Sequence, residues 1–305
     1  MSIPFSRNIF NLIILNILLV FAIGLTHCKK QIIRETKVGT IRLVPKQIIQ
    51  ASKEIILKDG KASVSSIPLK IIKSGGTFFI KRGEKEKNVY YVREDIIERF
   101  FKMLNREVSS SFITENFYEY DSYSISEENA FSIRIVGENG EILLDVYFGC
   151  LDATGERQYV RRGNVSSSVL SIEDIASSFL TTEPSFWVDM QIYKEKLKNN
   201  HITSIEAGNE ATRRGITDDT LFSDVEKALK SLTMIDVYDG VVNEGSNTKH
   251  LTISFEKGEK TEIAITPLGT GDFIFRDDRG GAYVLSSYSY KRFIEKINNI
   301  VGVRG

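Results

Sequence analysis

Residues 131–149 read FSIRIVGENGEILLDVYFG, and this stretch decides the fold. Apolar residues alternate with polar ones from Phe131 to Ile135, which is the pattern of a strand with one buried face. Turn residues follow from Gly137 to Gly140, and the alternation resumes from Ile142 to Phe148. Because a connection of a few residues can join only antiparallel strands, the stretch predicts two paired strands.

The same pattern returns in the second half of the chain. Residues 251–265 read LTISFEKGEKTEIAI, which alternates, turns at Gly258 and alternates again. A third strand is predicted after each pair, at residues 159–162 and 273–276. Helices are predicted before and after both sets of strands, because apolar residues recur there at helical spacing. These helices span residues 97–104, 172–179, 225–232 and 290–297.

We therefore predict an α+β fold with an internal duplication. Each of its two similar halves packs helices on one face of an antiparallel sheet. The alternative is two α+β stretches that are merely similar, but five matches in the same order favour duplication. Short apolar runs at residues 55–57, 69–72, 78–80 and 90–92 predict further strands. The expected boundaries are a signal peptide at 1–27, a tether at 28–50, a first half at 51–182, a linker at 183–201 and a second half at 202–303.

The first 28 residues have the composition of a targeting signal. Arg7 supplies a positive charge, residues 9–24 form an apolar stretch interrupted by two asparagines, and residues 25–28 read LTHC. A spanning helix needs about 20 apolar residues, so the stretch is marginal for a span and suitable for a signal peptide. We expect cleavage before a lipidated Cys28. An uncleaved membrane anchor and simple secretion are the alternatives.

Lipidation at Cys28 would place the protein in the cell envelope. One acyl chain such as palmitate anchors only marginally, since each buried methylene contributes about 0.8 kcal/mol, and several chains on one cysteine hold firmly. We expect the membrane to be a partner through this anchor, at a periplasmic or outer-membrane face. With Cys28 acylated, Cys150 has no partner, so no disulfide is expected and a buried small residue is the simpler role.

Composition excludes some classes of function. Lys and Arg total 40, as do Asp and Glu, so the chain lacks the basic excess of a general nucleic-acid-binding protein.

His201 and His250 stand singly, without the spacing of metal ligands. Residues 269–272 are predicted as a hairpin loop rather than a phosphate site, and residues 277–281 as a turn rather than a calcium loop. We expect no catalytic residues, metal or small-molecule cofactor.

One aromatic segment is a candidate surface for binding another envelope protein. Tyrosines of this kind occur in protein interfaces. The alternative is that they cover a sheet edge and pack on the first helix. A cluster of arginines could likewise form a small basic site or an exposed strand face. The candidate partner-binding residues are Phe117, Tyr118, Tyr120, Tyr123 and Trp187, and the arginines are Arg157, Arg161 and Arg162.

Seven segments follow one another in a characteristic order along the chain. They are Tyr90–Val92, the helix 97–104, Phe148-Gly149, Gln158–Arg161, Val169–Ile172, Trp187–Asp189 and Ile202–Ile205. This ordered set resembles the bacterial family catalogued as domain of unknown function 4340. The likeness covers most of residues 70–300, and where the family shows Tyr-Gly-Leu this chain has Tyr123-Ser124-Ile125. The resemblance implies an envelope-associated, membrane-tethered domain, sometimes encoded near exporter and gliding components, and supplies no catalytic residues.

The sequence thus favours a lipid-anchored cell-envelope protein that acts as a non-catalytic binding or scaffold module. An accessory subunit of a membrane export or gliding assembly is the alternative that the resemblance supplies. An enzyme acting on envelope polymers is a further alternative, which would need two carboxylates converging in a cleft.

Overall fold

The computed structural model describes residues 38–61, 67–82, 87–163, 166–208, 210–213 and 219–301. The predicted signal peptide, Cys28 and the predicted tether up to residue 37 lie outside the described residues. From Gly39 onward the chain forms one compact unit. None of the helices in the described ranges has both the length and the apolar character needed to cross a membrane.

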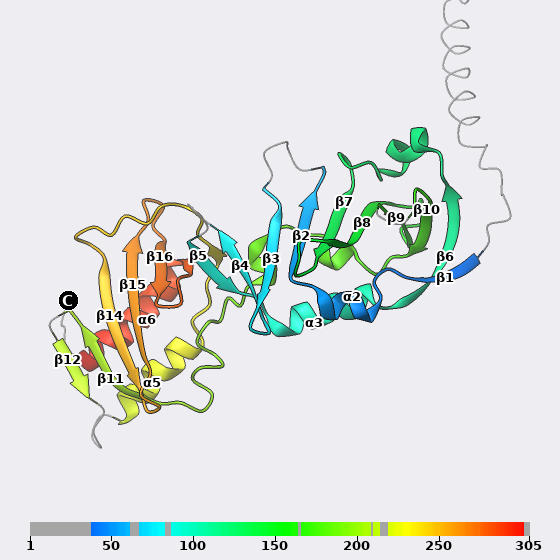
Figure 1. The fold of residues 1–305 in the computed structure, drawn as a ribbon. Coiled ribbons are helices and arrows are strands. Elements are labelled where there is room, and N and C mark those ends of the chain that lie inside the picture. Colours follow the sequence, from blue (N-terminus) through cyan, green and yellow to red (C-terminus); the bar gives the residue numbers. More distant parts are fainter. Residues whose placement is uncertain are drawn as a thin grey trace, which may run out of the picture. The chain divides into compact units, whose positions relative to one another are not determined.

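Ten strands form the first sheet, in the order β1-β6-β10-β9-β8-β7-β2-β3-β4-β5, as far as the chain is described (Figure 1). The pairings from β6 through to β5 are all antiparallel, which confirms the predicted sheet type. The strands are β1 Val38–Arg42, β2 Glu54–Asp59, β3 Leu69–Ser74, β4 Thr77–Arg82, β5 Asn88–Tyr91, β6 Glu107–Thr114, β7 Phe131–Val136, β8 Ile142–Leu151, β9 Arg157–Arg162 and β10 Val169–Glu173.

The stretch 131–149 forms the predicted pair of strands, β7 and β8. Phe131 lies opposite Phe148 and Ile133 lies opposite Val146, so the apolar residues of both strands face the same core. A two-residue turn joins β3 to β4. Gly75 and Gly76 adopt φ values of 58° and 85°, which a two-residue hairpin loop requires and which glycine adopts without strain.

Helix α3 (Glu94–Leu104) covers the inner face of the first sheet. Two acidic residues in its first turn stabilise the helix, because their negative charges lie at the positive end of the helix dipole. Ile97, Phe100 and Leu104 are buried in the same core as the inward residues of β2 and β7, as their spacing predicted. Figure 1 shows α3 and the short α2 (Lys46–Ala51) along this sheet.

Part of the segment expected to be a tether belongs to the first sheet. Residues 38–42 form β1, which lies beside β6 at the edge of the sheet. Leu43 and Val44 follow and are fully buried, and the Val44 N–H donates to the Leu104 carbonyl at 3.0 Å. Residues from Gly39 onward are therefore part of the folded unit.

Seven strands form the second sheet, in the order β12-β11-β14-β15-β16-β17-β13, again within the described ranges. Helices α5 (Asp219–Lys230) and α6 (Ser287–Val301) contribute Phe222, Val225, Phe293 and Ile297 to its core. A short α4 (Pro184–Trp187) precedes this sheet. The strands are β11 Ile202–Ala207, β12 Glu210–Arg213, β13 Asp236–Val237, β14 Lys249–Phe255, β15 Lys260–Pro267, β16 Phe273–Asp277 and β17 Ala282–Leu285.

One predicted helix is wrong. Residues 169–173 form strand β10, which pairs with both β6 and β9, and only a short 3-10 turn (η3, Ser177–Phe179) follows. The spacing of Ile172, Ile175 and Phe179 matched a helix by coincidence across a strand and a turn. The Asp174 carboxylate accepts from the N–H groups of Ala176 and Ser177 and so stabilises this turn.

Candidate functional site

The outer face of the first sheet, opposite α3, is unusual because part of it is also covered. A strand with one covered face alternates between buried and exposed residues, whereas residues 144–148 of β8 are all buried. Asp145 and Tyr147 point to this outer face. The residues packed around Tyr147 there are Tyr120, Ile125, Ala130 and Val169, with Ile113, Tyr123 and Tyr159 at the border.

Asp145 is the centre of a polar network on this face. Its carboxylate accepts from Arg134 on the neighbouring strand β7, with Nη2 to Oδ2 at 3.0 Å and Nε to Oδ1 at 3.4 Å. The Asp145 side chain is 11% exposed and that of Arg134 is 42% exposed. The Tyr147 hydroxyl lies 3.1 Å from Asp145 Oδ2 and 3.4 Å from Glu127 Oε1. Because the Tyr147 hydroxyl can donate only one hydrogen bond, the shorter distance favours Asp145 as the acceptor.

The protonation states of two of these groups follow from their surroundings. Burial, and then the negative charges of Asp145 and Glu127, raise the pKa of Tyr147 to about 12. The hydrogen bonds that Arg134 donates to the Asp145 carboxylate raise the pKa of Arg134 further above its ordinary value. At neutral pH the Tyr147 hydroxyl therefore keeps its proton and Arg134 keeps its charge. The Arg161 guanidinium stacks on the Tyr147 ring, 4.2 Å from its centroid, and lies 5.0 Å from that of Tyr120.

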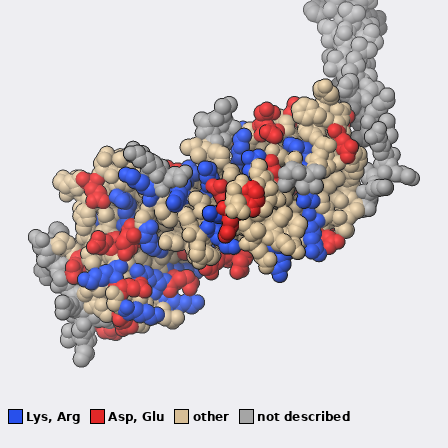
Figure 2. Space-filling model, in the orientation of Figure 1, with Lys and Arg blue, Asp and Glu red and all other residues tan. Residues whose placement is uncertain are grey.

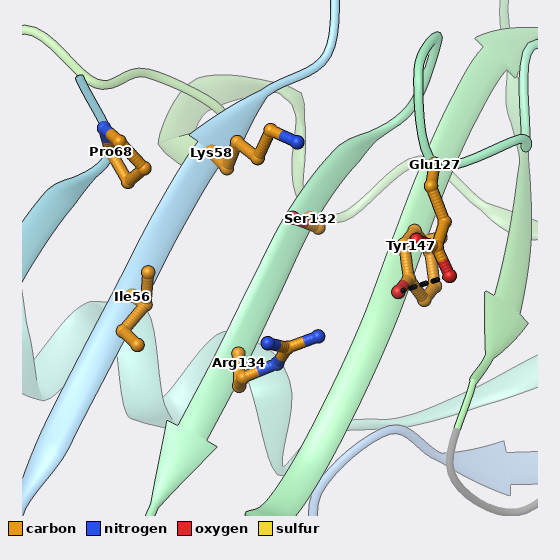
Figure 3. A pocket seen from close by; sticks show the side chains of 7 residues that line it. All are labelled: Ile56, Lys58, Pro68, Glu127, Ser132, Arg134 and Tyr147. Carbon is orange, nitrogen blue, oxygen red and sulfur yellow. Dashed lines mark hydrogen bonds between the residues drawn. The ribbon is translucent and has the colours of Figure 1, made fainter. Parts of the chain in front are cut away.

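A pocket of about 250 Å³ opens beside this network (Figure 3). The strand register places Lys58 of β2 opposite Ser132 of β7, and Ile56 opposite Arg134. Figure 3 shows the Lys58 ammonium extended toward Ser132, with Glu127 beside the Tyr147 hydroxyl across the pocket. The lining residues are Ile56, Lys58, Pro68, Glu127, Ser132, Arg134 and Tyr147.

A larger hollow of about 1040 Å³ lies beside the start of α3 and carries several acidic side chains. They include Glu94, Asp95, Glu98, Asp189 and Glu195. A hydrogen bond from Arg93 lowers the pKa of Asp95, so this carboxylate stays ionised at neutral pH. A general acid needs the opposite shift, toward a pKa near the working pH. The geometry of Asp95 therefore suits an ion pair and not proton donation.

The predicted aromatic patch is divided by the fold. Phe117 and Tyr118, in the 3-10 turn η2 (Phe117–Tyr123), are 71% and 90% exposed. Tyr120 is buried, and its hydroxyl donates to the Ser167 carbonyl. Tyr123 packs on Tyr159, with ring centroids 4.7 Å apart. Tyr120 and Tyr123 therefore lie on the outer sheet face and not on the first helix, and only Phe117 and Tyr118 present large exposed surfaces.

Trp187 does not belong to a surface, so its assignment to a partner-binding patch is corrected. Its side chain is completely buried, and the indole N–H donates to the Thr181 carbonyl at 3.1 Å. Its ring packs edge-on against Phe100 of α3, with centroids 5.2 Å apart. A tryptophan carries a large apolar area, so its burial here anchors the segment after β10 to the first core.

The three predicted arginines have different surroundings. Arg157 donates to the hydroxyl and the carbonyl of Ser171, at 2.9 and 2.6 Å. Arg161 stacks on Tyr147, whereas Arg162 pairs with the inward-facing Val146 and so lies on the opposite face. Cys150 is half-buried, with its sulfur 3.4 Å from the Tyr123 carbonyl oxygen. These residues do not form one site.

The segment predicted as a turn at residues 277–281 also holds a buried ion pair. The Asp277 side chain is fully buried and lies 2.6 Å from Arg279 Nη2. The Tyr193 hydroxyl donates to the same carboxylate at 3.1 Å, and Arg279 donates to the Ile192 carbonyl at 3.0 Å. This network fixes the segment after α4 against the second sheet, which is a structural role.

Two features of the sequence indicate the outer-face site. Residues 131–149 form one hairpin with Arg134 on its first strand and Asp145 on its second, and opposite charges on paired strands attract. A β-bulge between Ile135 and Val136 places the two residues directly opposite each other, so the turn length alone does not set this pairing. An aspartate in the middle of an otherwise apolar strand is a further signal. Lys58 could not be placed in the same way, because the pairing of β2 with β7 joins distant parts of the sequence.

Comparisons with known proteins give little further information. No family model matches the chain, and no solved structure matches it. An uncharacterized protein of Treponema pallidum (strain Nichols) is 26% identical over 173 residues, which cover 57% of this chain and 53% of the relative. The matched region thus spans about half of that relative, and its name assigns no activity to it.

Proposed function

We propose that this protein is held in the cell envelope by a lipid on Cys28, and that its α+β domain is a non-catalytic binding or scaffold module. The observation that carries the anchor is the sequence of residues 1–28, in which a positive charge and an apolar stretch lead directly to a cysteine. Such a leader is typical of a cleaved targeting signal, and acyl chains on the cysteine would then hold the domain at a bilayer.

Membrane fractionation of the full chain tests the anchor. The unmodified protein is expected in the membrane fraction and to need detergent for release. Cys28→Ser removes the acceptor thiol and should lose lipid attachment, whereas Cys150→Ser keeps it and serves as the matched control. Release of the unmodified protein without detergent would contradict the proposal. Equal membrane retention of both variants would favour the uncleaved anchor instead.

Two surface features support a binding role. Phe117 and Tyr118 are exposed aromatic side chains next to each other, with ring centroids 6.1 Å apart, and aromatic residues are enriched in protein interfaces. The pocket on the outer face of the first sheet is the second feature. A photocrosslinker placed at Tyr118 in the native membrane should capture a reproducible envelope protein. The same probe at Tyr288, an exposed tyrosine on α6, should not capture it.

We also propose that the two halves arose by duplication, and the strand order supports this. In the first sheet the run β6-β10-β9-β8-β7-β2-β3 has the same spatial order as β13-β17-β16-β15-β14-β11-β12 in the second, with β4 and β5 as an insertion between β3 and β6. A helix also precedes β6 and β13 in the chain. The corresponding strands β2 and β11 support a first half that begins near residue 51 and a second that begins near 202.

The likeness to the domain of unknown function 4340 family remains part of this proposal. Its ordered segments fall on β5, α3, the end of β8, β9, β10, α4 and β11, all within one compact unit. Membership would favour a tethered accessory subunit near an exporter or gliding assembly. Genes for such components beside this one would support that role, and their absence would weaken it.

A further inference from the structure

We propose that the pocket on the outer face of the first sheet binds a small acid whose carbon skeleton also carries hydrogen-bond donors. This inference rests on the proposed binding role and names the class of ligand. Two kinds of molecule share this chemistry, a sugar acid with hydroxyl donors and an amino acid with an ammonium donor.

Lys58, Ser132 and Arg134 supply the side of the pocket that would hold the acid group. The Lys58 ammonium has neither a hydrogen bond nor an ion pair with any described residue, so its charge is free to meet an anion. Asp145 engages Nε and Nη2 of Arg134, which leaves Nη1 for a ligand. The Ser132 hydroxyl lies between them on β7 and can donate a third hydrogen bond. Hydrogen bonds from charged donors to a carboxylate or phosphate are the strong ones.

Glu127 and Tyr147 supply an acceptor side across the pocket. The Tyr147 hydroxyl oxygen lies 3.1 Å from Asp145 Oδ2 and 3.4 Å from Glu127 Oε1, so its hydrogen bond goes to Asp145. The Glu127 carboxylate therefore keeps lone pairs for a donor on the ligand. Lys58 and Glu127 also give the pocket opposite charges on opposite sides (Figure 3). A bare anion would meet repulsion from Glu127, whereas an acid with donors on its skeleton satisfies both sides.

Ile56 and Pro68 form an apolar wall that suits the carbon skeleton of the ligand. The volume of about 250 Å³ is below the range of drug-sized sites, which is about 300–1,000 Å³, and it limits the ligand to a single ring or an amino acid. Figure 2 shows Lys and Arg interspersed with Asp and Glu on the visible face of the molecule, without an extended field of one sign.

Calorimetric titration of the detergent-purified full chain tests the ligand class with four probes. Glucuronate carries an acid and hydroxyls, and alanine carries an acid and an ammonium. Glucose keeps the donors without the acid, and acetate keeps the acid without the donors. We expect glucuronate or alanine to bind at least tenfold more tightly than both glucose and acetate, and whichever binds identifies the source of the acid. Glucose or acetate binding as tightly, or no binding of glucuronate and alanine, would overturn the proposal.

Two variants locate the binding. Lys58→Gln should weaken binding by about tenfold or more, because it removes one charged hydrogen bond from an exposed side chain. Lys260→Gln, at an exposed lysine of β15 in the second sheet, should leave binding unchanged. Equal affinities for both variants would rule out this pocket. The affinities are measured in detergent and do not depend on Cys28, so failure here leaves the test of the lipid anchor unaffected.

Discussion

The two sheets share an order of strands but differ in what covers their outer faces. On β8 of the first sheet residues 144–148 are all buried, with Asp145 and Tyr147 on the outer side. On β15 of the second sheet Glu262 at the outer side is exposed and Ala264 is half-buried. The shared strand order thus leaves the outer face of a sheet exposed to solvent, and the buried polar site forms on this face only where another segment packs on it.

The connection before the central strands explains the difference. In the first sheet residues 115–130 link β6 to β7, and Tyr120 and Ile125 from this segment pack on Tyr147. In the second sheet residues 238–248 link β13 to β14 without a helix or strand, and most of them are exposed. The segment 115–130 shields Asp145 from solvent, and a buried carboxylate must be hydrogen-bonded or paired with a positive charge.

Loss of the Tyr147 side chain should have the largest effect on stability. Tyr147→Ala removes a buried ring and one hydrogen bond to Asp145, and we expect the free energy of unfolding to fall by about 3–5 kcal/mol. Glu262→Ala on the exposed face of β15 should change it by about 0.5 kcal/mol or less. Urea denaturation of both variants measures this. Similar losses would show that the two outer faces do not differ.

Arginines with similar exposure but different partners sharpen the comparison. Arg134 is 42% exposed and pairs with the nearly buried Asp145, whereas Arg276 of β16 is 38% exposed and pairs with Glu244, itself 42% exposed. Arg134→Gln should cost about 2 kcal/mol, because it leaves a buried carboxylate without its charge partner while the exposed guanidinium moderates the effect.

Arg276→Gln should cost about 0.5 kcal/mol or less, since exposed ion pairs contribute little. The two values come from the same denaturation assay. A loss for Arg276→Gln as large as for Arg134→Gln would contradict the view that the Arg134–Asp145 pair is buried and the Arg276–Glu244 pair is exposed.

Alkaline pH should weaken the first-sheet network. The folded pKa of Tyr147 is raised from 10.0 to about 12, so the protonated hydroxyl stabilises the folded state fully below about pH 10. That contribution is lost as the pH rises toward 12. The free energy of unfolding should fall over this window, and Tyr147→Phe should reduce the fall. Tyr90, Tyr193 and Tyr283 also have raised pKa values, so part of the fall persists. An unchanged alkaline profile in the Tyr147→Phe variant would contradict the prediction.

The smallest expected effect concerns the backbone of the covering segment. Ser124 has a φ of 52°, a left-handed conformation that favours glycine. Ser124→Gly should raise the free energy of unfolding by about 0.5 kcal/mol, since relief of strain exceeds the extra entropy of the unfolded chain. Ser126→Gly in the same loop, at a residue without positive φ, should lower it. A loss of stability in both variants would argue against strain at Ser124.

Local patterns in the sequence predicted much of the fold and little of the site. Alternation gave β7 and β8, and helical spacing gave α3, because each pattern lies within a short segment. The helix at residues 172–179 was wrong, since three apolar residues on a strand and a turn reproduced helical spacing. Trp187 was assigned to a surface because its burial depends on contact with Phe100, which is distant in the sequence.

The pocket depends on the same long-range contacts. Lys58 and Ser132 meet only because β2 pairs with β7, and no local pattern sets that register. The contact between Arg134 and Asp145 was easier to predict, because both residues lie on the same hairpin. Cys28 lies outside the described residues, so the lipid anchor still depends on the sequence alone.

Intact-mass spectrometry of the chain extracted from membranes tests the central proposal most directly. The account predicts a mature polypeptide that begins at Cys28 and carries the added mass of acyl chains. A polypeptide that still begins at Met1, or one that begins at Cys28 without acyl mass, would contradict it.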